Sequence, residues 1–132
     1  MNFLYNNYSY FQDTHEYKNR GSTGFLYKNE KFNCPFLYIR TEDTENFFSV
    51  HFRTPQEDNT GISHMLEHLA LQGSKQYPIR NVFFELNKRS YSTFMNAFTS
   101  SEYTAFPFAS TNQTDFLNDL NVYLDCVFHP QL

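Results

Sequence analysis

The sequence lacks several features that would assign it to a common class of protein. It has no tryptophan, two cysteines and four glycines among 132 residues. No apolar run approaches the roughly 18 residues that a membrane-spanning helix requires. Lysine and arginine number 10 against 14 aspartates and glutamates, so the formal net charge is −4. We therefore expect no membrane partner, and no nucleic-acid partner because no basic stripe is present to neutralise phosphates.

The few cysteines argue against a thiolate metal site. Cys34 and Cys126 stand alone and form no CxxC pair. Lone cysteines of this kind are usually buried thiols, so we expect no disulfide and, by default, a reducing compartment. Residues 1–17 have no arginine and no apolar segment, and resemble neither a secretory signal nor a mitochondrial transit peptide. We expect residues 1–20 to be poorly ordered, because they show no periodicity.

Aromatic residues are plentiful: 16 phenylalanines and 10 tyrosines account for 20% of the chain, and hydrophobic residues for 40%. This composition and length allow one domain with an aromatic core. Segments dense in aromatic and β-branched residues predict strands over 23–28, 32–40, 47–54 and 103–109. Pro35 favours an edge position or a bulge for the second strand. Alternate residues of the third strand would face one side, namely Phe48, Val50 and Phe52.

Three further segments have the pattern of helices. Residues 60–72 form the first, with Asn59 or Thr60 as N-cap and Gly73 as the glycine beyond its C-terminus. Pro78 is expected to open a second helix that runs to about residue 89. The third covers 114–128 and ends before Pro130. Residues 90–96 are ambiguous, and 97–109 look extended. This order predicts an α+β fold, a mostly antiparallel sheet with helices packed on one face.

The first predicted helix contains the pattern HxxEH, at residues 64–68. His64 and His68 lie about 40° apart on the helix surface, one turn from each other. Two imidazoles so placed can reach one zinc ion at about 2.0–2.1 Å, with Glu67 beside them. Zinc lowers the pKa of a bound water and polarises a carbonyl, and a neighbouring carboxylate can take the water's proton. The pattern therefore indicates His64 and His68 as metal ligands and Glu67 as the catalytic base.

The rest of this helix is apolar. We expect its apolar stripe to be buried in the core, leaving the two histidines and the glutamate facing a cleft. The stripe consists of Ile62, Met65, Leu66, Leu69 and Ala70. A bare five-residue pattern also arises by chance on polar helix faces, so the sequence around it has to support the metal site.

The flanks of the helix resemble the pitrilysin family of zinc peptidases, whose signature is the order HxxEH. The matching segments are 52–55, 60–68, 73–78, 92–99, 103–104, 107–108 and 122–128. Within the family they are most similar to the presequence protease and falcilysin branch. The similarity runs from near Glu42 to the end of the sequence, and such dense matches are not explained by chance.

The resemblance implies a zinc-dependent metalloendopeptidase that cleaves short or unfolded peptides. His64 and His68 would bind Zn²⁺ and Glu67 would be the base. Asn96 and Ala97 match a segment that contacts the substrate backbone in relatives, where an extended peptide adds to a sheet edge; the alternative is that Asn96 only forms a turn. Residues 21–132 would be part of an N-terminal peptidase domain. The family implies a mitochondrion, and the cytoplasm is the alternative because no clear transit peptide is seen.

Two departures from the family pattern matter. Family enzymes are several times longer, and their third zinc ligand, a glutamate on a later helix, would lie beyond Leu132. A catalytic zinc usually has three protein ligands. Internal candidates for the third are Glu85, Glu102 and His129, of which Glu102 is the best placed. The second departure is Gln72, where the presequence branch often has cysteine.

The missing ligand leaves two functions open. In the first, the chain would be a fragment of a longer, active peptidase, completed by the missing C-terminal portion or by a complementing chain. Alternatively, it is an inactive truncated or partner module that binds peptide, or zinc weakly, without hydrolysis. The intact HxxEH triplet favours the first function, and the absent third ligand favours the second.

Overall fold

The computed structural model describes residues 8–10, 21–29, 31 and 33–132, which belong to two compact units. The first unit ends at Asp43, and the second runs from Thr44 to Leu132. The expectation of a poorly ordered segment at 1–20 falls, apart from one short strand, outside the described residues. The expected peptidase-domain boundaries of 21–132 stay a prediction.

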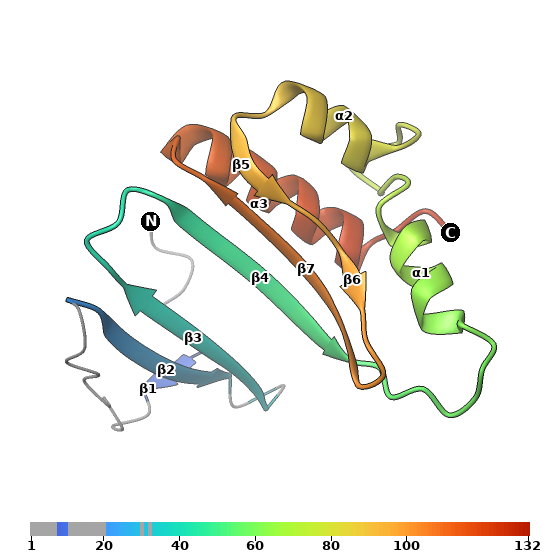
Figure 1. The fold of residues 1–132 in the computed structure, drawn as a ribbon, viewed down its shortest axis with the longest axis horizontal. Helices are drawn as coiled ribbons and strands as arrows, with labels where there is room; N and C mark the ends of the chain where they lie inside the picture. The colour runs from blue at the N-terminus through green and yellow to red at the C-terminus, as the bar shows by residue number, and fades with distance from the viewer. Residues whose placement is uncertain (1–7, 11–20, 30, 32) are drawn as a thin grey trace. The chain divides into compact units, whose positions relative to one another are not determined.

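The first unit contains a three-stranded antiparallel sheet in the order β1-β2-β3 (Figure 1). Its strands are β1 (Tyr8–Tyr10), β2 (Thr23–Asn29) and β3 (Cys34–Arg40). The predicted strands at 23–28 and 32–40 are confirmed, although residue 32 lies outside the described residues. Pro35 sits in β3, at an edge of the described sheet, as its missing N–H requires. Cys34 is an exposed free thiol, so the expectation of two buried cysteines is wrong for this one.

The second unit is built on an antiparallel sheet in the order β4-β7-β5, with β6 also paired to β7. Its strands are β4 (Asn46–Arg53), β5 (Ser92–Met95), β6 (Phe98–Thr99) and β7 (Tyr103–Ser110). Two of them confirm the predictions at 47–54 and 103–109. The ambiguous stretch contains β5. The extended stretch 97–109 is interrupted, because the Ser100 N–H donates to the Tyr103 carbonyl over 2.8 Å and turns the chain between β6 and β7.

One face of this sheet carries the core of the second unit, and all three helical segments contribute to it. The Phe108 side chain on β7 is fully buried, and its ring lies 5.1 Å from those of Phe116 and Tyr123 on α3 (Gln113–Phe128). Leu71 and Val82 join the same cluster. The predicted α+β class, with a mostly antiparallel sheet, is confirmed. None of the helices in the described part of the chain is long and apolar enough to cross a membrane.

The start of α1 (Ile62–Ala70) differs from the prediction. Its N-cap is Gly61, which adopts the left-handed conformation with φ of 70°, and neither Asn59 nor Thr60 caps it. The Thr60 hydroxyl and N–H are both bonded to Asp58 Oδ1, at 2.5 and 2.9 Å. Thr60 therefore closes a turn before the helix, and its oxygen does not reach the helix's free N–H groups.

The segment between α1 and α2 (Val82–Arg89) also corrects two predictions. Pro78 does not open α2, because Asn81 adopts a left-handed conformation with φ of 59° directly before it. Gly73 does not have the positive φ of a helix-ending glycine. It is needed for close packing, because a Cβ atom there would lie 2.9 Å from the Ile79 carbonyl oxygen.

Candidate metal centre

Helix α1 contacts β6 and β7 with its charged side and exposes most of its apolar side, the reverse of the expected orientation. Glu67 is only 6% exposed. The large apolar residues of α1 are all exposed, namely Ile62, Met65, Leu66 and Leu69. Of the predicted stripe, only Ala70 packs against the core. The prediction failed because it assumed that the apolar face of an amphipathic helix is covered by this chain's own core.

The two histidines of α1 face each other at the helix surface. His64 Nε2 and His68 Nε2 are 3.1 Å apart, and the ring centroids are separated by 4.6 Å. Two nitrogens bound to one tetrahedral zinc at about 2.0–2.1 Å would be separated by about 3.3 Å. The imidazole pair therefore fits a shared zinc ion.

Glu67 completes a cluster of three possible ligands with this pair. One ligand atom from each of His64, Glu67 and His68 lies within 4.8 Å of the others. In the described part of the chain, no other group of three or more histidine, cysteine, aspartate or glutamate residues comes so close together. The donor types suit zinc, which takes imidazole nitrogen and carboxylate oxygen.

The internal candidates for a third ligand are not part of this cluster. Glu85 forms ion pairs within α2, with Lys88 at 3.5 Å and Arg89 at 3.1 Å. The Glu102 carbonyl accepts the Thr54 N–H, but the carboxylate does not join the histidines. If Glu67 acts as the base and not as a metal ligand, the described residues supply only two ligands, His64 and His68.

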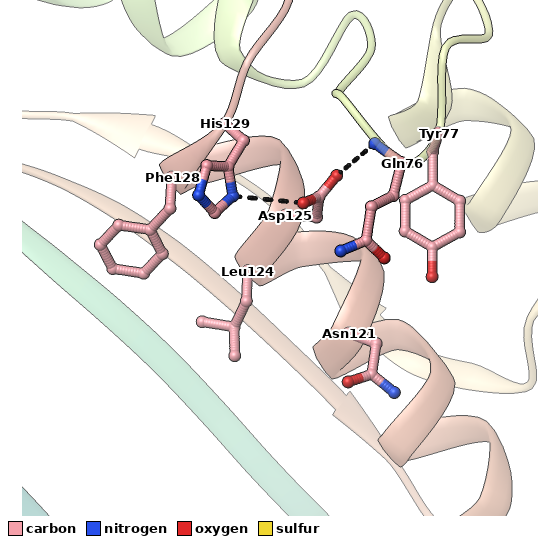
Figure 2. A pocket seen from close by; sticks show the side chains of 7 residues that line it. All are labelled: Gln76, Tyr77, Asn121, Leu124, Asp125, Phe128 and His129. Carbon is pink, nitrogen blue, oxygen red and sulfur yellow. Dashed lines mark hydrogen bonds and ion pairs between the residues drawn. The ribbon is translucent and has the colours of Figure 1, made fainter.

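His129, the remaining candidate, lies at a different cavity, at the C-terminal end of α3 (Figure 2). Its Nδ1 is 3.2 Å from Asp125 Oδ1, and Asp125 Oδ2 accepts the Gln76 N–H over 2.9 Å. Hydrogen bonds from Ser74 and Gln76 lower the pKa of the Asp125 carboxyl below its ordinary value, and His129 contributes in the same direction. This cavity, of about 540 Å³, contains none of the HxxEH residues. His129 is therefore a partner of Asp125 and not of the histidine pair.

A smaller cavity, of about 140 Å³, adjoins the HxxEH helix. Asn96 and Ala97 line it together with Glu67 and His68. The fold therefore brings these four residues together, and the role of Asn96 and Ala97 in substrate contact stays a prediction. The other lining residues are Leu71, Gln72, Phe83 and Phe84. Asn96 Oδ1 also accepts the Ala97 N–H over 2.9 Å, a local contact of the kind that turn-forming asparagines make.

Sequence reasoning assigned no role to Thr99, which directly contacts the candidate base. Its hydroxyl donates to Glu67 Oε2 over 2.6 Å. Thr99 lies in the segment 92–99 that carries the family resemblance, and this was the available signal. Phe83 and Phe84, which also line this cavity, were likewise assigned no role from the sequence.

Comparison with known proteins gives consistent results. A family model described as Insulinase (Peptidase family M16) matches residues 53–132. The chain is 50% identical over 110 residues to "Presequence protease, mitochondrial" of Emericella nidulans, covering 83% of this chain and 10% of that protein. It is 49% identical to the Xenopus tropicalis protein of the same name and 48% identical to "Presequence protease 1, chloroplastic/mitochondrial" of Arabidopsis thaliana. These matches also cover 83% of this chain, and 11% and 10% of the two proteins.

The fold has a counterpart among solved structures. The crystal structure of pitrilysin superposes with a TM-score of 0.78 at 21% identity, over 94% of this chain and 14% of that one. The chain thus spans about a tenth of the length of its curated relatives. The family model, the relatives and the fold agree with the resemblance carried by the HxxEH segment. The chain belongs to peptidase family M16, the insulinase or pitrilysin family, and is similar to its presequence proteases.

Proposed function

We propose that this chain carries the N-terminal part of a zinc-dependent metalloendopeptidase, with His64 and His68 as ligands and Glu67 as the general base. The observation that carries the proposal is the 3.1 Å separation of the two Nε2 atoms, with a Glu67 oxygen in the same cluster. Membership of a peptidase family supports hydrolysis of peptides as the reaction class.

The chain's own residues divide the work. When bound by His64 and His68, zinc supplies Lewis acidity, which polarises a carbonyl and lowers the pKa of a coordinated water. Glu67 takes the proton from the attacking water and passes it to the leaving amine. The Thr99 hydroxyl holds one carboxylate oxygen of Glu67, so the base approaches the substrate in a single orientation.

We assign Asn96 and Ala97 to binding of the substrate backbone. Both residues line the cavity that contains Glu67 and His68, and they lie between β5 and β6. An extended peptide that adds to a sheet edge is held by main-chain hydrogen bonds with little demand on its sequence. Short or unfolded peptides suit this mode, because a folded substrate cannot offer a free strand.

We place the protein in the mitochondrion, because the relatives compared above carry mitochondrial or chloroplastic/mitochondrial in their names. The cytoplasmic alternative finds no support in these relatives.

We expect the third ligand to come from outside the described residues, and favour the remaining part of a longer enzyme or a complementing chain as its source. The exposed apolar face of α1 is where we expect that polypeptide to dock. Met65 is 62% exposed and Ile62 58%, on the helix that carries both histidines. Burying this face would bring the added polypeptide beside the metal site and remove apolar surface from water.

The second candidate function is a non-catalytic module that binds peptide, or zinc weakly. The small number of metal ligands favours this second function. When Glu67 acts as the base, only His64 and His68 remain as ligands, whereas a catalytic zinc usually has three protein ligands.

Zinc stoichiometry of the purified chain after dialysis tests the metal site, with a quenched unstructured peptide as substrate. His64→Ala should abolish metal retention. His51→Ala is the matched control, because His51 is also exposed but lies outside the cluster. Glu67→Gln should keep the metal and abolish cleavage.

The outcomes separate the two functions. Stoichiometric zinc that depends on His64, with cleavage that depends on Glu67, would establish an enzyme within these residues. Zinc retained without cleavage, or little zinc in a folded chain, would favour the non-catalytic module or a site that needs added polypeptide. Zinc retained equally by His64→Ala would contradict the assignment of the ligands.

A further inference from the structure

Three threonine side chains form a connected series of hydrogen bonds that ends on Glu67. The Thr99 hydroxyl is 2.6 Å from Glu67 Oε2. Thr99 Oγ1 is also 3.2 Å from Thr104 Oγ1, which is in turn 2.8 Å from Thr54 Oγ1. Three separate segments thus meet behind the candidate base: β6, β7 and the end of β4.

The strand register places these hydroxyls together. Thr99 on β6 pairs directly with Thr104 on β7, so both side chains lie on the same face of the sheet. Phe52 on β4 pairs with Thr104 from the other side. Thr54 lies two residues after Phe52, so its side chain is on the same face of the sheet as that of Thr104. The Thr54 N–H holds this position by donating a hydrogen bond of 3.0 Å to the Glu102 carbonyl.

The series has a single direction. Each threonine has one hydroxyl proton to donate. Thr99 gives its proton to Glu67, so it must accept from Thr104. Thr104 has then used its own proton and must accept from Thr54. All three hydroxyl dipoles therefore point toward the Glu67 carboxylate, and such chains of hydrogen bonds reinforce one another.

Burial makes this arrangement consequential. Glu67 is 6% exposed and Thr104 is 4% exposed. Among the described residues, Thr99 is the only hydrogen-bond donor to the Glu67 carboxylate, and it binds Oε2, which leaves Oε1 for a water or substrate. A buried carboxylate without such a donor is unfavourable, so removing the hydroxyl would free the side chain to rotate.

We propose that Thr99 is a positioning residue for Glu67 and that Thr104 and Thr54 orient its hydroxyl. The effect of Thr99 on catalysis rests on the proposed function, in which Glu67 is the general base. The contact joins two side chains of this chain, so it can be tested without metal or substrate. The first test therefore measures the Thr99–Glu67 coupling in the metal-free chain.

That test is a double-mutant cycle of urea unfolding in EDTA, followed by circular dichroism. Thr99→Val should lower the midpoint when Glu67 is present and no longer lower it in a Glu67→Met background. Thr99→Ser, which keeps the hydroxyl, should leave the midpoint unchanged. The exposed Thr114→Val is the control and should behave alike in both backgrounds. An equal fall of the midpoint from Thr99→Val in both backgrounds would overturn the proposal. If the valine variant does not fold, Thr99→Ala replaces it in the same cycle.

The second test uses peptide cleavage by the zinc-loaded chain. Thr99→Val should lower kcat about ten- to hundredfold, the order of loss for a misplaced catalytic group, with KM unchanged. Thr99→Ser should keep the wild-type kcat. A change confined to KM, or equal losses from both variants, would overturn the proposal. If the wild-type chain cleaves nothing, the proposed function fails for this chain, whereas the metal-free cycle still decides the role of Thr99.

Discussion

Asp119 should lower the free energy of unfolding of this protein as the pH rises from acidic to neutral. Its side chain on α3 is 1% exposed, and its Oδ2 atom has no hydrogen-bond partner among the described residues. Burial raises the pKa of Asp119 from 3.8 to about 6, the charge of Asp115 adds to the rise, and a hydrogen bond from Ser90 opposes it. The neutral acid is therefore the form that the folded state favours.

The size of the effect follows from linkage between protonation and folding. The folded pKa lies above the unfolded one, so the stabilisation is complete below pH 3.8 and is lost as the pH rises through about 6. At about 1.4 kcal/mol for each pKa unit, the loss approaches about 3 kcal/mol at neutral pH. Asp119→Asn removes the ionisation but keeps a polar group. The free energy of unfolding of this variant, relative to wild type, should therefore rise by about 2.5 kcal/mol between pH 4 and pH 7.5.

Urea unfolding of both proteins across this pH range measures the difference, in which the other titrating groups cancel. Asp125→Asn is the control on the same helix. The pKa of Asp125 is lowered by Ser74 and Gln76, so its ionised form stabilises the fold above the unfolded pKa and that contribution disappears toward acid. Asp125→Asn should therefore lose stability relative to wild type as the pH rises. A difference in unfolding free energy between Asp119→Asn and wild type that does not change with pH would mean that Asp119 does not titrate with a raised pKa in the folded state.

Three substitutions test the packing. Gly73→Ala should destabilise the fold by about 1–3 kcal/mol, because its Cβ would meet a backbone oxygen at 2.9 Å; Gly24→Ala, with nothing within 4 Å, should not. Phe108→Ala, at a fully buried position, should cost about 3–5 kcal/mol in urea unfolding, against little for Phe47→Ala, which is 64% exposed. Met65→Ser should change the unfolding free energy of this chain by no more than about 0.5 kcal/mol. A large loss from the last change would mean that the apolar face of α1 is buried after all.

The face that α1 turns inward shows where sequence reasoning was insufficient. The spacing of His64, Glu67 and His68 was visible in the sequence, because it depends only on the helical repeat. The prediction that the apolar side of α1 is buried was wrong. An apolar stripe indicates which side of a helix can be buried, but not which surface of the protein covers it. In this chain Glu67 is buried and Met65 is exposed.

Local patterns were sufficient for most of the elements. The strands β2, β4 and β7 and the helix α3 lie within about two residues of their predicted bounds, because alternation and helical periodicity are properties of short segments. The caps of α1 and the start of α2 were missed. They depend on the left-handed conformations of Gly61 and Asn81, which the spacing of apolar residues does not indicate.

The HxxEH triplet, the family that its flanks resemble and the α+β class all follow from the order of residues along the chain. Only the tertiary structure brought Thr99, which is 32 positions away in the chain, onto Glu67, and Asn96 and Ala97 to the cavity beside it. Sheet register and helix docking decide which distant segments of the chain come into contact. No periodicity within a single segment encodes which hydroxyl will reach a buried carboxylate.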